Sequence, residues 1–192
     1  MRYVFLDVDG VLNSRYTTND NGIVKGLAAI DHRNLAAFNT LMQELYKRYG
    51  KQNVKIILSS SWRIGGYRGK NAFRDMLDEE LRKYRLFIHD ITPDLPMGER
   101  GIEISTYLSE KLGILGGYLV LDDVFYTDYK PYITRHWVRT SYEALSGRGG
   151  FYEKHIKYAL KMISIPVKSD ELNYLKQLYY RSKVSAASSK YI

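Results

Sequence analysis

Three short, almost wholly apolar runs recur along this chain, and each one stops at a polar residue. The runs are residues 3–6, 54–58 and 117–121. Runs of this length, without the alternation of a half-exposed strand, are typical of strands buried on both faces in a parallel sheet. Two weaker runs, residues 86–88 and 137–140, are predicted to be further strands. The chain is therefore expected to bury both sides of a sheet.

The segments between these runs carry the spacing of amphipathic helices. Apolar side chains recur every three or four residues from Leu35 to Tyr49, with Asp31 as a candidate N-cap and Gly50 as a candidate stop. Further helices are predicted around residues 72–84, 101–112, 152–163 and 170–183. Strands that alternate with helices predict an α/β fold, a doubly wound and mainly parallel sheet with helices on both faces.

The length of 192 residues is that of one domain. Pro166 is the candidate boundary, so we expect a core over residues 1–165 and a C-terminal helix with a frayed tail over residues 166–192. Asn21-Gly22 lies between Tyr16-Thr17-Thr18 and Ile23-Val24 and predicts a small hairpin flap. No apolar run approaches the roughly 18 residues that span a membrane, so we expect a cytoplasmic protein.

The charge of the chain indicates its class of partner. Lysine and arginine outnumber aspartate and glutamate by 29 to 21, which gives a net charge of +8. This balance favours nucleic acid or another polyanion, although a basic surface that merely aids solubility explains it equally well. No acid occurs between Glu44 and Asp75, which slightly favours phosphate binding. The chain has no cysteine, which excludes thiol nucleophiles and disulfides.

Polar residues of matching chemistry follow three of the predicted strands. Asp7 and Asp9 follow the first, Ser59 the second, and Asp122 and Asp123 the fourth. Because the carboxyl ends of parallel strands meet at one edge of a sheet, we expect these side chains to lie together. Four carboxylates there would repel one another unless a cation binds, and oxygen ligands indicate Mg²⁺. Residues two apart leave a strand on the same side, so one acid can attack while the other moves a proton.

Several runs of this sequence resemble the motifs of a known enzyme superfamily. The run DVDGVLN at residues 7–13 resembles the first motif of the haloacid dehalogenase (HAD) superfamily of aspartate-nucleophile phosphatases. Residues 56–59 resemble its second motif, Arg100 its third and residues 121–123 its fourth. The order and spacing agree over about residues 1–165, so the resemblance implies a HAD-like Rossmannoid core.

A narrower resemblance rests on three further motifs. Ser-Ser-Trp-Arg at residues 60–63, Thr-Pro-Asp-Leu at 92–95 and Arg-Gly-Ile-Glu-Ile at 100–104 are similar to a branch of small HAD domains associated with RNA repair proteins. The chain departs from that branch at Val124, after the acid pair, and in a basic segment over residues 130–148.

The HAD resemblance implies roles for named residues. Asp7 would be the nucleophile that forms an aspartyl-phosphate, and Asp9 would be the general acid and base. Ser59 and Arg100 would bind the phosphoryl oxygens, with Ser60 as an alternative to Ser59. The implied ligands of Mg²⁺ are Asp7, the backbone carbonyl of Asp9, and Asp122, with Asp123 as a ligand or a neighbour of one. Further candidates for substrate binding are Arg63, which is equally well a solvated loop residue, and Asn13.

The substrate class follows from what the chain lacks around these motifs. HAD phosphatases of small metabolites often carry a cap domain after the first or second motif. The segments 13–53 and 63–100 are too short for one, so an open site without a cap is expected. Together with the basic charge, this implies a phosphate on an RNA or DNA end, and a 3′-phosphatase is the leading interpretation. For Trp62, packing in the core is favoured over stacking on a base.

Three alternatives remain. One is a nucleotidase or other small-molecule phosphatase, with the hairpin at residues 15–25 as a partial lid; it would turn over mononucleotides with weak dependence on salt. Another is a nucleic-acid-binding module without catalysis, which would bind without Mg²⁺ and turn over no phosphoester. A phosphoprotein phosphatase is less favoured. The sequence leaves the oligomeric state and the choice between RNA and DNA open.

Overall fold

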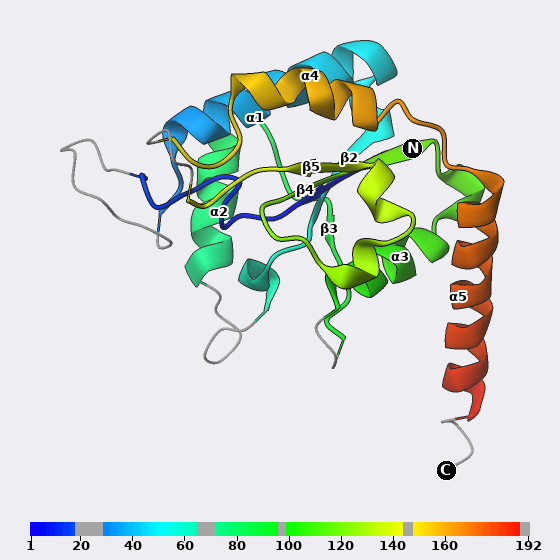
Figure 1. Cartoon of the computed structure of the whole chain (residues 1–192). Helices are drawn as coiled ribbons and strands as arrows, with labels where there is room; N and C mark the ends of the chain where they lie inside the picture. The colour runs from blue at the N-terminus through cyan, green and yellow to red at the C-terminus, as the bar shows by residue number, and fades with distance from the viewer. Residues whose placement is uncertain (18–28, 65–71, 96–98, 144–147, 189–192) are drawn as a thin grey trace.

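The computed structural model describes residues 1–17, 29–64, 72–95, 99–143 and 148–188 (Figure 1). Its centre is a five-stranded parallel sheet in the order β3-β2-β1-β4-β5. The strands are β1 (Arg2–Leu6), β2 (Val54–Leu58), β3 (Asp90–Ile91), β4 (Gly117–Asp122) and β5 (Trp137–Arg139). The α/β class and the parallel sheet are as predicted from the alternation of apolar runs and helical segments.

Helices connect the strands and cover both faces of the sheet. They are α1 (His32–Tyr49), α2 (Ala72–Lys83), α3 (Arg100–Ser109), α4 (Glu153–Met162) and α5 (Ser169–Ser188). The predicted limits of α1 are confirmed, because Asp31 accepts a hydrogen bond from the Arg33 backbone N–H at 2.9 Å and Gly50 ends the helix with a φ of 83°. In Figure 1, α1 and α4 lie on one face of the sheet, and α5 lies beside α3.

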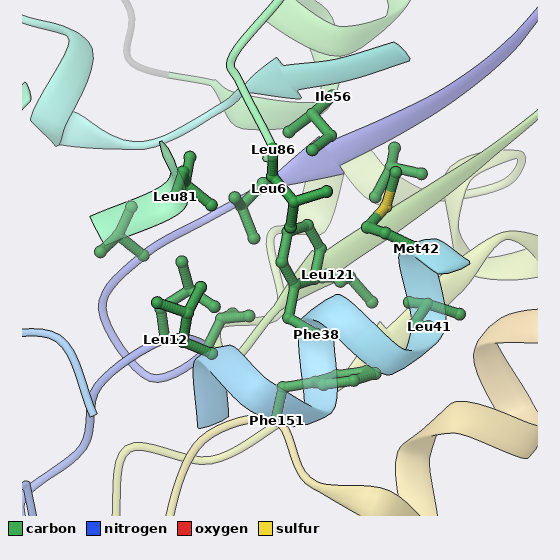
Figure 2. Packing of buried hydrophobic residues seen from close by; sticks show 14 of the residues in the cluster. Leu6, Leu12, Phe38, Leu41, Met42, Ile56, Leu81, Leu86, Leu121 and Phe151 are labelled. Carbon is green, nitrogen blue, oxygen red and sulfur yellow. The ribbon is translucent and has the colours of Figure 1, made fainter. Parts of the chain in front are cut away.

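One face of the sheet carries an aliphatic cluster, formed with α1, α2 and α4. Figure 2 shows Phe38 of α1 among Leu6, Leu121 and Phe151. All four of these side chains are fully buried. Full burial of one such side chain contributes about 1.5–3 kcal/mol, so this cluster is a main source of stability.

The other face carries a tyrosine cluster, formed with α3 and α5. Alternate residues of the strands point into it, so that Phe5 and Tyr118 lie on this face while Leu6 and Leu119 lie on the other. Leu175 of α5 is also buried here, so the apolar stripe of this helix packs on the core. The domain boundary at Pro166 stays a prediction.

The strand predicted at residues 86–88 was wrong, because the paired residues are Asp90 and Ile91. Leu86 is instead buried in the aliphatic cluster, where the chain crosses from α2 to the sheet, while Phe87 is exposed. An apolar crossing segment and an apolar strand have the same composition, which explains the error. The predicted hairpin flap falls on residues 18–28, outside the described residues. Within the described part of the chain, no inserted cap domain is evident and no helix is long and apolar enough to cross a membrane.

Candidate active site

The register of the central strands places the predicted site residues side by side. Leu6 at the end of β1 pairs with Leu58 of β2 and with Leu121 of β4. The ladder continues one residue further, since the Asp7 N–H donates to the Leu121 carbonyl at 3.0 Å and the Ser59 N–H donates to the Leu6 carbonyl at 2.9 Å. The carboxyl ends of β1, β2 and β4 therefore form one edge, as the sequence predicted.

Asp7, Asp122 and Asp123 form a carboxylate trio at this edge, in which one oxygen of each lies within 4.8 Å of the others. Asp7 and Asp122 are almost fully buried. Burial raises the pKa of Asp7 well above its usual range, and the charge of Asp122 raises it further. Burial likewise raises the pKa of Asp122 to about 6. Three crowded carboxylates with raised pKa values fit a hard divalent cation such as Mg²⁺, which takes oxygen ligands.

Gly10 lies against the side chain of Asp123 in the trio and leaves space for it. Its φ of 75° lies in the left-handed region that favours glycine. A Cβ atom at this position would also collide with the side chain of Asp123. The loop after β1 can therefore pass closely beside Asp123 because residue 10 has no side chain.

Two donors fix the carboxylate of Asp9 beside the trio. The Asn13 side-chain amide donates to its Oδ1 at 2.8 Å, and the indole N–H of Trp62 donates to its Oδ2 at 3.0 Å. The Asn13 oxygen in turn accepts the Gly10 backbone N–H at 3.0 Å. Asn13 thus lies at the site and orients Asp9; its contact with substrate stays a prediction, as does the metal contact of the Asp9 carbonyl.

Trp62 is a site residue that sequence reasoning missed. Packing was predicted for it, and it is indeed buried in the aliphatic cluster. Its indole N–H nevertheless reaches Asp9, which is distant in the sequence. No local spacing relates the two residues. The remaining signal is that a buried indole N–H usually has a hydrogen-bond partner.

Arg100, in the first turn of α3, brings a buried positive charge to the edge. Its Nη1 donates to the Ser59 carbonyl and, at 3.4 Å, to the Ser59 hydroxyl, and its Nη2 lies 4.0 Å from an oxygen of Asp7. Burial disfavours this charge, but the carboxylates of Asp7 and Asp122 outweigh burial and raise the pKa of Arg100. The guanidinium therefore stays charged beside the carboxylate of Asp7.

Ser59 and Ser60 are both buried at the site. The Ser59 hydroxyl faces Arg100, whereas the Ser60 hydroxyl donates to the Asp7 carboxylate and accepts the Trp62 backbone N–H at 3.4 Å. Both hydroxyls lie at the site, and the choice between them as phosphoryl ligand stays a prediction.

Arg63 stabilises the loop that contains Ser59 and Ser60. Its guanidinium is buried in an ion pair with Glu103 of α3 at 2.6 Å, and its Nη1 donates to the Ser60 carbonyl at 2.8 Å. It is thus a buried residue rather than a solvated one. Its contact with substrate stays a prediction.

Three groups of the β4–β5 region orient Asp122, and sequence reasoning identified none of them. The Tyr129 hydroxyl donates to Oδ2 at 2.8 Å, and the Val124 backbone N–H donates to Oδ1 at 2.9 Å. The indole N–H of Trp137 donates to the Asp122 carbonyl at 3.0 Å. Asp122 is therefore fixed from both its side chain and its backbone.

Comparison with known proteins agrees with this geometry. A family model described as the HAD domain in Swiss Army Knife RNA repair proteins matches residues 3–147, which include every site residue described above. No curated protein and no solved structure matches the chain. The match covers well over half of the 192 residues. The chain therefore belongs to the HAD family, as a small domain of the kind found in Swiss Army Knife RNA repair proteins.

Proposed function

We propose that this protein is a Mg²⁺-dependent phosphomonoesterase that removes a terminal phosphate from a polynucleotide end, with the 3′ end as the leading interpretation. The observation that carries the proposal is the position of Asp7, which lies between the charge of Arg100 and the carboxylates of Asp122 and Asp123. A nucleophile, a phosphate-binding cation and a metal-binding group thus meet at one point. The HAD family membership supports phosphatase-type chemistry.

In the first step a carboxylate oxygen of Asp7 attacks the phosphorus atom. The new bond joins this oxygen to phosphorus, and the ester bond to the leaving hydroxyl breaks. Asp9 donates the proton that the leaving oxygen needs. Arg100 and the hydroxyl of Ser59 or Ser60 bind the phosphoryl oxygens, whose charge must be stabilised as the bonds change.

In the second step Asp9 accepts a proton from water, and this water attacks the phosphorus of the aspartyl-phosphate. The bond between phosphorus and the Asp7 oxygen breaks, which releases phosphate and restores the carboxylate. The hydrogen bonds from Asn13 and Trp62 keep Asp9 in one orientation for both proton transfers. Mg²⁺ bound by the trio would neutralise the carboxylates and the phosphate oxygens, so that the two negative groups can approach.

Three observations favour a polynucleotide end as the substrate. The net charge of +8 suits a polyanion, whose backbone supplies sequence-independent attraction. The family description places related domains in RNA repair proteins. A terminal phosphate on a long chain also needs an accessible site, and the described part of the core carries no inserted cap.

The test is Mg²⁺-dependent release of phosphate from three substrates: a 3′-phosphorylated oligonucleotide, its 5′-phosphorylated counterpart and a mononucleotide. We expect the 3′-phosphorylated oligonucleotide to be preferred, with a preference that weakens as salt rises because phosphate contacts are screened. Asp7→Asn should abolish turnover, whereas Asp75→Asn, on the exposed surface of α2, should not.

The outcomes separate the alternatives. Equal or better turnover of the mononucleotide would make this protein a small-molecule phosphatase and the basic charge incidental. Undiminished turnover by Asp7→Asn would contradict the aspartyl-phosphate mechanism for every substrate.

A further inference from the structure

Four aromatic side chains form a continuous group that begins beside Asp122 of the carboxylate trio. We call this group, Phe125, Tyr126, Tyr129 and Trp137, the aromatic platform. The ring of Trp137 lies 5.7 Å from that of Phe125 and 5.8 Å from that of Tyr129, whose ring is 5.4 Å from Tyr126. These separations are those of aromatic rings in direct contact. The four rings therefore behave as one packed unit.

The outer part of this platform is exposed. Phe125 is 39% exposed and the neighbouring Val124 is 45% exposed, although both are large apolar residues. Trp137 is half-buried behind Phe125. The exposed ring of Phe125, which packs at 42° against the ring of Trp137, presents an apolar surface to solvent.

Two cations flank the exposed rings. The ammonium group of Lys130 lies 5.7 Å from the centre of the Phe125 ring, and the guanidinium of Arg139 lies 5.9 Å from that of Trp137. Both side chains are exposed. Aromatic rings interleaved with exposed cations are the combination that binds single-stranded nucleic acid, because bases stack on the rings and phosphates pair with the cations.

The inner end of the platform is part of the active site. Tyr126 lies against Arg100, whose guanidinium is 5.7 Å from the centre of its ring, and Tyr126 also accepts a hydrogen bond from that guanidinium. Tyr129 and Trp137 hold Asp122 through its carboxylate and its carbonyl. A ligand whose phosphate is bound by Arg100 therefore has this platform as its immediate neighbour.

We propose that the aromatic platform is a nucleoside subsite: Phe125, backed by Trp137, stacks on the base of the nucleotide that carries the scissile phosphate, and Lys130 and Arg139 pair with backbone phosphates. This inference rests on the proposed function and deepens it. It makes the terminal base, of any sequence, a determinant of turnover, because every base has an aromatic face.

The test varies the base and the ring together. Wild-type protein and Phe125→Ala are assayed on two 3′-phosphorylated oligonucleotides that differ at the terminal nucleotide, which is either intact or abasic. Glycerol 2-phosphate, which has no ring, is the reference substrate and shows whether each variant is folded and active. The quantity compared is kcat/KM for each oligonucleotide divided by kcat/KM for glycerol 2-phosphate.

We expect the wild-type protein to prefer the intact terminus by about tenfold, the size of effect that loss of one stacked base produces. Phe125→Ala should remove this preference, whereas Phe125→Tyr, which keeps a ring, should retain it. A matched control is Phe87→Ala. Phe87 is 46% exposed and has the ammonium of Lys51 5.3 Å from its ring centre, but it precedes β3 and so lies toward the opposite end of the sheet. Phe87→Ala should leave the preference for the intact terminus unchanged.

The failures of the two proposals are distinguishable. If the wild-type protein hydrolyses both oligonucleotides equally well, or if Phe125→Ala keeps the preference, the nucleoside subsite is wrong while the proposed function stands. If glycerol 2-phosphate is hydrolysed but neither oligonucleotide is, the polynucleotide substrate is wrong and the subsite fails with it.

Discussion

The two faces of the sheet are built differently. The aliphatic cluster under α1, α2 and α4 consists mainly of leucine, isoleucine, valine and phenylalanine side chains that contact one another. The tyrosine cluster under α3 and α5 is bound to acids instead. The hydroxyl of Tyr118 donates to Glu171 at 2.5 Å, that of Tyr107 to Asp90 at 3.0 Å and that of Tyr129 to Asp122 at 2.8 Å.

This difference separates two kinds of stability. Packing of apolar groups depends little on pH or on ligands, because no charge changes. A face whose hydroxyls donate to carboxylates is coupled to the protonation of those acids, and one of them, Asp122, belongs to the carboxylate trio. We therefore expect the aliphatic face to contribute most of the free energy of unfolding. The tyrosine face should make that free energy depend on pH and on bound ligands.

The largest effect is expected from the aliphatic face. Phe38→Ala should lower the free energy of unfolding by about 3–5 kcal/mol, because it leaves a cavity where Phe38 contacts its neighbours. Urea unfolding followed by circular dichroism measures this value, and the exposed Phe87→Ala should change it by less than about 0.5 kcal/mol. A loss below about 1 kcal/mol for Phe38→Ala would show that the cluster is not the main source of stability.

The next effect is a pH dependence that arises at the trio. Folding raises the pKa of Asp7 well above its usual value near 3.8 and raises that of Asp122 to about 6, so the metal-free folded state binds more protons than the unfolded state between pH 3.8 and about 6. Stability must therefore fall as pH rises through this window, by an amount of the order of 2–3 kcal/mol for one such group. Urea unfolding in a chelator at a series of pH values measures it.

Two additions make this pH test specific. Mg²⁺ should stabilise the protein more at pH 7 than at pH 5, because it binds the ionised carboxylates. Asp122→Asn should flatten the profile, because it removes one of the titrating acids. A wild-type profile without a fall across this window would contradict the raised pKa values.

The third effect compares one tyrosine from each face. Tyr118→Phe should lower the free energy of unfolding by about 1–3 kcal/mol, since it leaves the buried Glu171 carboxylate without its donor. The hydroxyl of Tyr46, at the aliphatic cluster, is buried and has no hydrogen-bond partner among the described residues. Tyr46→Phe should therefore be neutral or stabilising by up to about 1 kcal/mol. Equal losses in the two variants would remove the distinction between the faces.

The smallest effect is expected for Trp62, a residue of the aliphatic cluster that nevertheless donates a hydrogen bond to an acid. Trp62 packs in the aliphatic cluster but donates to Asp9. Trp62→Phe should lower kcat by about 3- to 10-fold, the value of one hydrogen bond, with little change in KM. Phe73→Leu, which alters the ring that packs 5.0 Å from Trp62 but keeps the indole N–H, is the control. If both variants have the same kcat, the hydrogen bond to Asp9 does not matter.

Sequence patterns predicted the parts of this molecule that depend on local spacing. The three main strands, the caps of α1 and the meeting of Asp7, Ser59 and Asp122 at one edge all follow from runs of neighbouring residues. Arg100 was placed by its motif and does lie beside Asp7.

The contacts that the sequence did not predict join distant segments. The bond from Trp62 to Asp9 and the buried pair of Arg63 with Glu103 depend on how the loop after β2 packs, which no periodicity describes. Strand β3 was also not predicted, because its two residues are too few to form a recognisable pattern. The chemical roles of the site residues remain predictions that the experiments above address.

The central position of β1 has a consequence for the order of assembly. It pairs with β2 on one side and with β4 on the other, and β4 follows late in the chain. Asp7 is synthesised before its partner Asp122, because β2, β3 and the helices around them lie between the two residues in the chain. Pairing of such distant segments is slow, and a strand that waits for its neighbour exposes apolar edges. The arrangement of the carboxylate trio should therefore form only after β4 has paired with β1.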